Sequence, residues 1–426
     1  MQKILTLAIM PLAYPFLKSE RIYWGYVLGA LIIAAWIYRR NGRQDGLNSE
    51  ASKGSFWSFL FPKEVYRHRS AKQDFKFFYF NTVLQAILLL PLFAFATPAI
   101  SHCVQTLLSE WRVPGEGVLR VTLPACFLFT LAMAMAMDFA IFLSHYLQHK
   151  IPLLWEFHKV HHSAEVLNPV TVYRIQPVDN FLNFGFGVLL AGIAGGVGQH
   201  LFKGQGLLIE AFGINLLFAI HYFFGYNLRH SHIWVDYGPF WSRLFVSPAQ
   251  HQIHHSALSK HYDKNLGFIF SFWDSLFGTL YIPSGKETFP LGINAIENQK
   301  LSSVRALFVT PFISAFHQLK EGGRPLFLKR AFVVFLLMAF VCPGIYLGFA
   351  ATADLEKVDP AVYLENLTWQ EVRKKIDAGV VTVIIPTGGT EQNGPHIVLG
   401  KHNYIIHYTA GKIAEKITAE HKHSNP

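Results

Sequence analysis

Charged residues are scarce in this chain of 426 residues: Asp, Glu, Lys and Arg together make up 15%, and hydrophobic residues make up 51%. Soluble domains carry about 25% charged residues, so the composition disfavours a soluble protein and favours a membrane protein. The mean hydropathy of +0.27 agrees. The net charge is +10. Because the basic residues lie in loops between apolar runs, they indicate contact with a membrane surface and not with nucleic acid.

Cysteine is equally rare. Cys103, Cys126 and Cys342 are the three in the chain, and none stands in a CxxC pair. A disulfide framework or a zinc ribbon is therefore excluded. The sequence also lacks a P-loop and a dinucleotide-binding fingerprint. Any redox chemistry would consequently draw its electrons from a separate donor protein.

Long apolar runs are present instead. About 20 apolar residues are needed to cross the hydrocarbon core of a bilayer. Six segments qualify as candidate spans, at roughly 22–38, 81–100, 118–147, 181–198, 207–225 and 331–350. The fourth is short and rich in glycine, so it could form half of a tight hairpin with the fifth. The sequence predicts an all-α, multi-pass integral membrane protein.

The basic residues predict the orientation. Residues 39–80 hold nine basic and four acidic side chains, whereas 101–117 hold one basic and two acidic side chains. The positive-inside rule places 39–80 in the cytoplasm. Counting spans from there places 148–180 and 226–330 on the same face and 351–426 on the other. The two histidine-rich segments would then end on the same, cytoplasmic face of the membrane, where one site could collect them.

The histidines are concentrated and regularly spaced: 13 of the 21 fall within 145–261. Three clusters, HYLQH, HKVHH and HQIHH, supply His145 and His149, then His158, His161 and His162, then His251, His254 and His255. Offsets of three and four residues place at least two rings of each cluster on one helix face. A lone histidine is most often a hydrogen-bonded core residue, but three such clusters on one membrane face predict metal binding.

The number of rings predicts two metal ions, because eight or more imidazoles exceed the four ligands of one structural zinc. Imidazole suits iron, zinc and copper alike. A neutral shell of nitrogen ligands with open positions fits a redox metal that meets oxygen. We therefore expect two iron ions, for which zinc could substitute.

The clusters and their surroundings resemble a known superfamily. The segments HYLQH, WEFHKVHHSAEVLNPVTVYR, SPAQHQIHHS, HYDKN and WDSLFGT, within about 120–285, are similar to the fatty acid hydroxylase / sterol desaturase superfamily. The resemblance implies a helical membrane bundle with a cytosolic cap. It also implies a dimetal centre that hydroxylates or desaturates a lipid of the sterol, fatty acyl or alkylglycerol type, with O2 and external electrons.

The resemblance also implies a set of ligands. The eight histidines of the three clusters match the family's box positions. The family draws a further ligand from the segment between the second and third boxes, where HYFFGYNLRHSHI offers His221, His230 and His232. His230 ranks first among these three. His261 is a possible ligand or a supporting partner, and Asp138, seven residues before His145, could accept a hydrogen bond from a ligand ring.

A rival interpretation is a histidine-rich metal transporter or sensor without oxygenase activity. That class would distribute its histidines along the spans to line a path. Here they cluster at span ends and in loops, which favours the oxygenase.

The last 70 or so residues differ from the rest. TWQEVRKKIDAG predicts a helix with a glycine past its end, VVTVIIP predicts a buried strand, and YIIHYTAGKIAEKI predicts an amphipathic helix. The motif PTGGTEQNGPHIVLGKHN resembles the creatininase family, in which Glu391 would match a metal ligand. Asn393 and His402 depart from that family's pattern. We therefore expect a membrane domain at 1–350 and a truncated, small α/β segment at 355–426 without an active site of its own.

Overall fold

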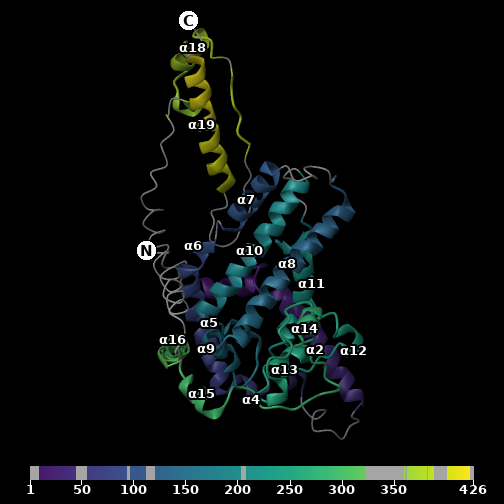
Figure 1. Ribbon diagram of the computed structural model, residues 1–426. Coiled ribbons are helices and arrows are strands. Elements are labelled where there is room, and N and C mark those ends of the chain that lie inside the picture. Colours follow the sequence, from purple (N-terminus) through teal and green to yellow (C-terminus); the bar gives the residue numbers. More distant parts are fainter. Residues whose placement is uncertain are drawn as a thin grey trace. The chain divides into compact units, whose positions relative to one another are not determined.

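The computed structural model describes residues 9–44, 55–93, 96–111, 120–202, 208–321, 359, 362–380, 382–387 and 401–422. The chain divides into two compact units, Met1–Tyr346 and Leu347–Pro426. The described residues are mostly helical, as Figure 1 shows. This agrees with the predicted helical fold.

Two helices of the first unit are long and apolar enough to cross a membrane: α8 (Leu123–Lys150) and α10 (Pro177–Leu201). α10 packs along both α8 and α7 (Ala96–Glu110). Glycines permit the close approach to α7, because a Cβ on Gly196 would lie 2.6 Å from the backbone oxygen of Ser101. The Ser101 hydroxyl donates a hydrogen bond of 3.0 Å to the Gly192 carbonyl. Small residues thus hold the two helix backbones together.

The other predicted spans have different outcomes. Most of the run at 22–38 lies in α2 (Trp24–Gln44), which begins two residues later than the predicted span. The run at 81–100 is divided among α5 (Arg69–Leu88), α6 (Leu90–Phe93) and α7. The run at 331–350 lies outside the described residues. Two spans are therefore supported by length and composition among the described residues, and the full multi-pass bundle stays a prediction.

The predicted span at 181–198 lies in α10 and is supported by length and composition, but its hairpin with 207–225 and the span at 207–225 were wrong. The fourth segment belongs to one continuous helix of 25 residues, α10, and not to half of a hairpin. In the fifth, strands β1 (Glu210–Ala211) and β2 (Ile214–Asn215) pair antiparallel around a turn at Phe212 and Gly213, which both have positive φ. α11 (Leu216–Phe223) follows with only eight residues. That length is too short to span a bilayer.

The remaining elements of the first unit are all shorter than α8 and α10. They are η1 (Tyr14–Phe16), α3 (Phe56–Leu60), α4 (Lys63–Tyr66), α9 (Pro152–His162), η4 (Pro169–Tyr173), η5 (Tyr226–Leu228), α12 (Gly238–Trp241), α13 (Pro248–His254), η6 (Ser259–His261), α14 (Phe272–Phe277), α15 (Ala295–Lys300) and α16 (Val304–Glu321). In Figure 1, α9, α13 and α14 lie toward the end of the bundle away from α7.

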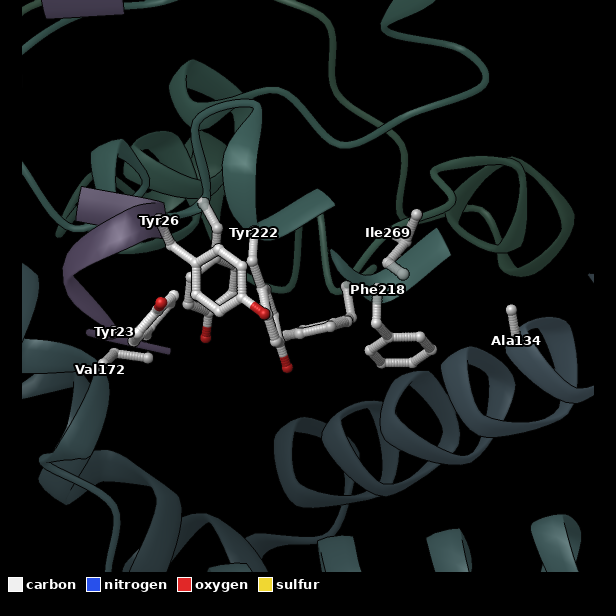
Figure 2. Close-up of a cluster of buried hydrophobic side chains, with 9 residues drawn as sticks. Tyr23, Tyr26, Ala134, Val172, Phe218, Tyr222 and Ile269 are labelled. Carbon is white, nitrogen blue, oxygen red and sulfur yellow. The ribbon is translucent and has the colours of Figure 1, made fainter. Parts of the chain in front are cut away.

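A buried aromatic cluster joins the N-terminal segment to α11 (Figure 2). Tyr26 meets Tyr222 with ring centroids 5.3 Å apart in an edge-to-face arrangement. Phe218 of α11 and Ala134 of α8 complete the contact toward the long helix. Edge-to-face aromatic pairs are favourable beyond the area they bury. The cluster therefore fixes the segment before α2 against the helices of the bundle.

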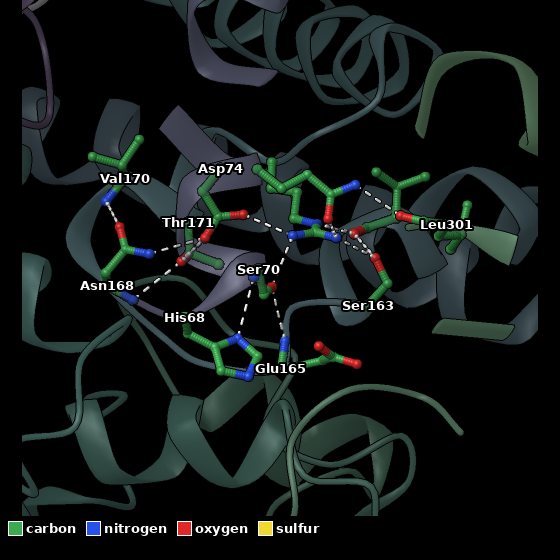
Figure 3. A network of polar contacts seen from close by, with 12 residues as sticks. His68, Ser70, Asp74, Ser163, Glu165, Asn168, Val170, Thr171 and Leu301 are labelled. Carbon is green, nitrogen blue, oxygen red and sulfur yellow. Dashed lines mark hydrogen bonds and ion pairs between the residues drawn. The ribbon is translucent and has the colours of Figure 1, made fainter. Parts of the chain in front are cut away.

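A buried ionic network, shown in Figure 3, fixes α9. The Arg174 guanidinium donates to Asp74 Oδ1 at 2.8 Å, to the Val160 carbonyl at 3.0 Å and to the Ser163 hydroxyl at 3.0 Å. Thr171 donates to the other Asp74 oxygen at 2.7 Å. A buried ion pair is tolerated only when its remaining polar atoms are hydrogen-bonded, as they are here. The network ties the C-terminal half of α9 to α5.

The second unit contains η8 (Leu364–Asn366), α18 (Trp369–Asp377) and α19 (Lys401–Lys422). α18 begins with a capping box between Thr368 and Glu371, and Gly379 follows its end with φ +87°. These features match the predicted helix. The prediction of a buried strand at 380–386 was wrong, because residues 382–387 are irregular and exposed, with no strand beside them among the described residues. Glu391, Asn393 and the His402 side chain lie outside the described part.

Replacing Arg174 by methionine should lower stability. The Asp74 carboxylate would stay buried without its cation, and breaking a buried pair in this way costs about 3–5 kcal/mol. We expect a clearly lower thermal midpoint in detergent. Arg174→Lys is the matched control, because it retains the charge and should lose less. A methionine variant that melts with the wild type would contradict this role of the network.

Candidate metal centre

The local fold brings the first two histidine clusters together. Ile151 ends α8 and also precedes the first turn of α9, so the two helices follow each other without an intervening loop. The pair His145 and His149 at the end of α8 therefore faces the pair His158 and His162 on α9. Within each pair the two histidines are four residues apart, which places both side chains on the same face of their helix.

The third cluster is held on α13. Its N-terminus carries a capping box between Ser247 and Gln250, with Pro248 in the first turn. These features start a helix at a defined residue. His251 and His254 follow in the single turn that remains, and His255 is the C-cap.

The structure divides nine histidines into two groups. The first holds His145, His149, His158, His162 and His254, and the second holds His161, His230, His251 and His255. Within each group, one ring nitrogen from every residue lies within 4.8 Å of the others. The two groups adjoin, because the rings of His162 and His255 are stacked with centroids 4.8 Å apart.

In the first group, oxygen atoms fix the outward nitrogen of four rings. Nδ1 lies 2.8 Å from the Leu266 carbonyl in His145 and 2.9 Å from the Lys264 carbonyl in His254. The other two contacts are with carboxylates: Nδ1 of His149 lies 3.2 Å from Asp263, and that of His158 lies 2.7 Å from Asp179. Carbonyl and carboxylate oxygens accept hydrogen bonds, so each Nδ1 carries a proton, and the neutral form of each ring would have its lone pair at Nε2.

Those lone pairs face one another. Nε2 of His145 lies 3.0 Å from Nε2 of His158, and Nε2 of His162 lies 3.2 Å from the same atom. Nε2 of His149 and of His254 are buried without a hydrogen-bond partner. Burial, followed by the nearby His158, lowers the pKa of His254 to about 3. That ring is therefore neutral at pH 7 and available as a ligand.

The second group converges on one atom. Nε2 of His230 lies 3.0 Å from that of His251, 3.2 Å from that of His255 and 3.3 Å from that of His161. One proton can join His230 to only one of these three nitrogens. Burial, then the neighbouring His230, lowers the pKa of His161 well below its usual range. Protonation of the rings therefore does not explain why three ring nitrogens lie so close to Nε2 of His230.

Arg229 distinguishes His251 from the other rings. Its guanidinium donates to Nδ1 of His251 at 2.8 Å and to the carbonyls of Phe268 and Gly267 at 2.6 and 3.1 Å. Arginine has no acceptor, so Nδ1 of His251 must accept the bond. The neutral ring then carries its proton at Nε2, on the side of the group's centre. Metal binding through that atom would release this proton.

The distances fit a metal ion in each group. Imidazole nitrogens lie about 2.0–2.1 Å from a bound transition metal. Two ligands at a right angle would then be about 3 Å apart. The observed distances of 3.0–3.3 Å between facing ring nitrogens match this ligand–ligand separation. The facing lone pairs and the unpartnered buried nitrogens also fit a cation between the rings.

The structure places the other candidates outside both groups. His221 Nε2 lies 3.4 Å from the Arg229 guanidinium, and His232 donates to the Phe59 carbonyl at 2.7 Å. His261 packs against Tyr281 and lies 3.3 Å from a Glu287 oxygen. The proposed contact between Asp138 and a ligand ring was wrong. Asp138 accepts from the backbone N–H groups of Ile269 and Phe270 and from the Trp273 indole.

Sequence reasoning missed two supporting residues. Asp179 stands in the first turn of α10, 21 positions after the His158 ring that it contacts. Arg229 directly precedes His230, and that adjacency was the available signal. No spacing rule connects Asp179 to its partner, because the contact depends on how α9 and α10 pack.

A cavity of about 520 Å³ adjoins both groups. Its lining includes His145 and His158 of the first group, His161, His230 and His251 of the second, and apolar side chains of α8, α10 and α11. Met137, Phe184 and Phe218 are examples of the apolar lining. The cavity thus pairs an apolar wall with a histidine-rich end.

Comparison with known proteins confirms the resemblance inferred from the clusters. Residues 130–279 match the family model of fatty acid hydroxylases, a segment that contains all nine grouped histidines. Residues 365–422 match the family model of creatinine amidohydrolases. No solved structure matches the chain.

The relatives act on lipids, according to their names. An alkylglycerol monooxygenase of Danio rerio is 28% identical over 159 residues, which cover 37% of this chain and 31% of that protein. The ornithine lipid hydroxylase OlsE of Rhizobium tropici is 26% identical over 198 residues, which cover 46% of this chain and 51% of that protein. An alkylglycerol monooxygenase of Caenorhabditis elegans is 28% identical over 146 residues, which cover 33% of this chain and 25% of that protein. The matched segment thus spans between a quarter and a half of each relative.

Replacing Asp179 by asparagine should weaken metal binding. The carboxylate holds the His158 proton at Nδ1, and loss of such a partner typically lowers metal affinity about 10–100-fold. The metal retained after dialysis against graded chelator measures the effect. Asn183→Ala is the control, because Asn183 bonds the other Asp179 oxygen at 2.8 Å and touches no grouped histidine. Equal retention in Asp179→Asn and wild type would contradict the assignment.

Proposed function

We propose that this chain is a membrane-bound lipid oxygenase that holds two iron ions in its two histidine groups and hydroxylates or desaturates a lipid with O2. The observation that carries the proposal is the convergence of nine imidazoles on two adjoining centres beside an apolar cavity. The fatty acid hydroxylase segment and the lipid-modifying relatives support it.

The ligand assignment follows the two groups. His145, His149, His158, His162 and His254 would hold one ion, and His161, His230, His251 and His255 would hold the other. His230 is preferred to His221 and His232, because those two bond Arg229 and the Phe59 carbonyl instead. Zinc fits the same nitrogen ligands and is a possible substitute.

Bound iron would supply the activation of O2 for attack on an unactivated C–H bond. The chain's own residues prepare the site. Asp179, Asp263 and two backbone carbonyls hold the Nδ1 protons, which directs the Nε2 lone pairs inward. The apolar wall of α8, α10 and α11 accommodates the alkyl part of a substrate and excludes water. Electrons would arrive from a separate protein.

The proposal includes a location. We place the chain in a membrane as a multi-pass protein, with the histidine groups at the cytoplasmic face, on the strength of its apolar helices and the excess of basic residues at 39–80. The creatininase-like segment would take no part in the lipid chemistry. The nine grouped histidines all lie in the first unit.

A metal transporter or sensor is the competing proposal. Such a protein would place ligands along its spans to form a path. The grouped histidines instead lie at the end of α8, on α9, beside η5 and at the end of α13. The apolar cavity also fits a lipid better than an ion path.

The first prediction of this proposal concerns metal content. The protein purified in detergent should carry close to two metal ions per chain. His254→Ala and His161→Ala should each lower that number, because each removes a ligand from a different group. Elemental analysis measures the content. His232→Ala, outside both groups, is the control and should retain the wild-type content. Unchanged content in both alanine variants would refute the two-group assignment.

The second prediction concerns the product. Lipids from cells that express the gene should contain a species that has gained one oxygen or lost two hydrogens. Mass spectrometry of lipid extracts detects it. Cells that express His254→Ala should lack the species, and those that express His232→Ala should contain it. A lipid profile identical with and without the active gene, at normal metal content, would favour the transporter or sensor.

A further inference from the structure

The cavity beside the histidine groups contains a guanidinium that the metal centre does not use. Arg21 lies in the segment before α2 and lines the same cavity as His145, His158, His161, His230 and His251. The Arg21 Cζ atom lies 5.8 Å from the ring centroids of both Tyr226 and Phe268. A cation over aromatic faces is stabilised without a paired carboxylate.

The segment that carries Arg21 is anchored. Asn227 donates to the Arg21 carbonyl at 3.0 Å, and the Tyr26 hydroxyl donates to the Lys18 carbonyl at 2.9 Å. Tyr23 and Tyr26 belong to the buried aromatic cluster, together with Tyr222 of α11 (Figure 2). The backbone that carries the Arg21 side chain is therefore held at a fixed place beside the cavity.

The cavity lining contains two guanidinium groups, of Arg21 and Arg229, and two carboxylates, of Asp179 and Glu210. Arg229 presents a second guanidinium to the same Tyr226 and Phe268 rings, at 5.6 and 5.3 Å. Asp179 and Glu210 are the carboxylates of the lining, and Asp179 is already bonded to His158 and Asn183. Burial raises the pKa of Glu20, the neighbour of Arg21, to about 7, so Glu20 carries only part of a negative charge at neutral pH.

The two arginines have different roles. Arg229 donates to two carbonyls and to His251, which occupies its donors within the protein. Arg21 is half-buried, lies in the cavity wall and donates one hydrogen bond to Tyr222, which leaves its other N–H groups for a ligand. A planar guanidinium binds carboxylate and phosphate oxygens by paired hydrogen bonds. The apolar side of the cavity, formed by residues such as Met137 and Phe218, suits an alkyl chain.

We propose that Arg21 binds an anionic oxygen group, a carboxylate or a phosphate, at the polar end of the lipid that occupies this cavity. The inference rests on the proposed function, since it takes a lipid as the occupant of the cavity. It goes further by specifying that the polar group of this lipid is negatively charged. The alkyl chain then lies along α8, α10 and α11, and the anionic group lies against Tyr226 and Phe268.

Equilibrium binding to the full-length protein purified in detergent tests the proposal. The probes are palmitate, hexadecyl phosphate and hexadecanol, which share one alkyl chain and differ in the polar end. Wild type should bind at least one of the two anions more tightly than the alcohol. The anion that binds more tightly identifies the group as carboxylate or phosphate. Wild-type protein that binds hexadecanol as tightly as both anions would overturn the proposal.

Variants assign the preference to Arg21. Arg21→Gln should weaken anion binding at least about tenfold, as expected for loss of a charge-assisted hydrogen bond, and should leave hexadecanol binding unchanged. Arg21→Lys should retain most of the preference. Lys72→Gln, an exposed position on α5 outside the cavity, is the control. Equal weakening of alcohol and anion in Arg21→Gln would show that Arg21 only braces the aromatic wall, which overturns the proposal.

Because binding is measured without turnover, the two proposals fail separately. Anion binding that depends on Arg21, in a protein that produces no oxidised lipid, would contradict the oxygenase alone. Oxidised lipid from a protein whose binding ignores the anionic group would contradict the role of Arg21 alone. Metal content and thermal midpoint of each variant show that the histidine groups are intact.

Discussion

The structure is organised around buried ring nitrogens, most of them unprotonated, that face one another. Nε2 of His230 meets three other imidazole nitrogens at 3.0–3.3 Å, and two further Nε2 atoms, of His149 and His254, have no partner. Burial opposes further protonation of these rings, and the proton on Nε2 of His251 can join His230 to one neighbour only, so the other nitrogen lone pairs still repel one another. The surrounding protein must hold them together by its own packing and hydrogen bonds.

Several buried polar contacts serve that purpose. Arg174 and Asp74 fix the backbone of α9, and the Asp179 and Asp263 carboxylates and two carbonyls fix the orientation of the rings. Asp138 holds the backbone at Ile269, close to the carbonyls that orient His145 and Arg229. Each of these groups stabilises the site one step away from the rings, as outer partners of metal sites commonly do.

The sequence predicted the histidine site better than the bundle. Spacing of three and four residues is a local property, so the clusters that contain His145, His158 and His254 could be recognised directly. The turn at Phe212 and Gly213 could not, because an apolar run predicts burial without specifying helix or hairpin. The same limit applies to partners distant in sequence, which is why Asp179 was missed and Asp138 was given the wrong contact. These assignments depend on helix packing, which no local pattern encodes.

The facing lone pairs also have a consequence for the cell. If the two histidine groups hold the metal ions proposed above, bound metal would make the folded chain more stable whenever metal is abundant. A chain synthesised during metal scarcity would open more often around α9 and α13, and quality-control proteases degrade such open forms. The amount of protein in the membrane would then rise and fall with the metal supply, without any change in transcription.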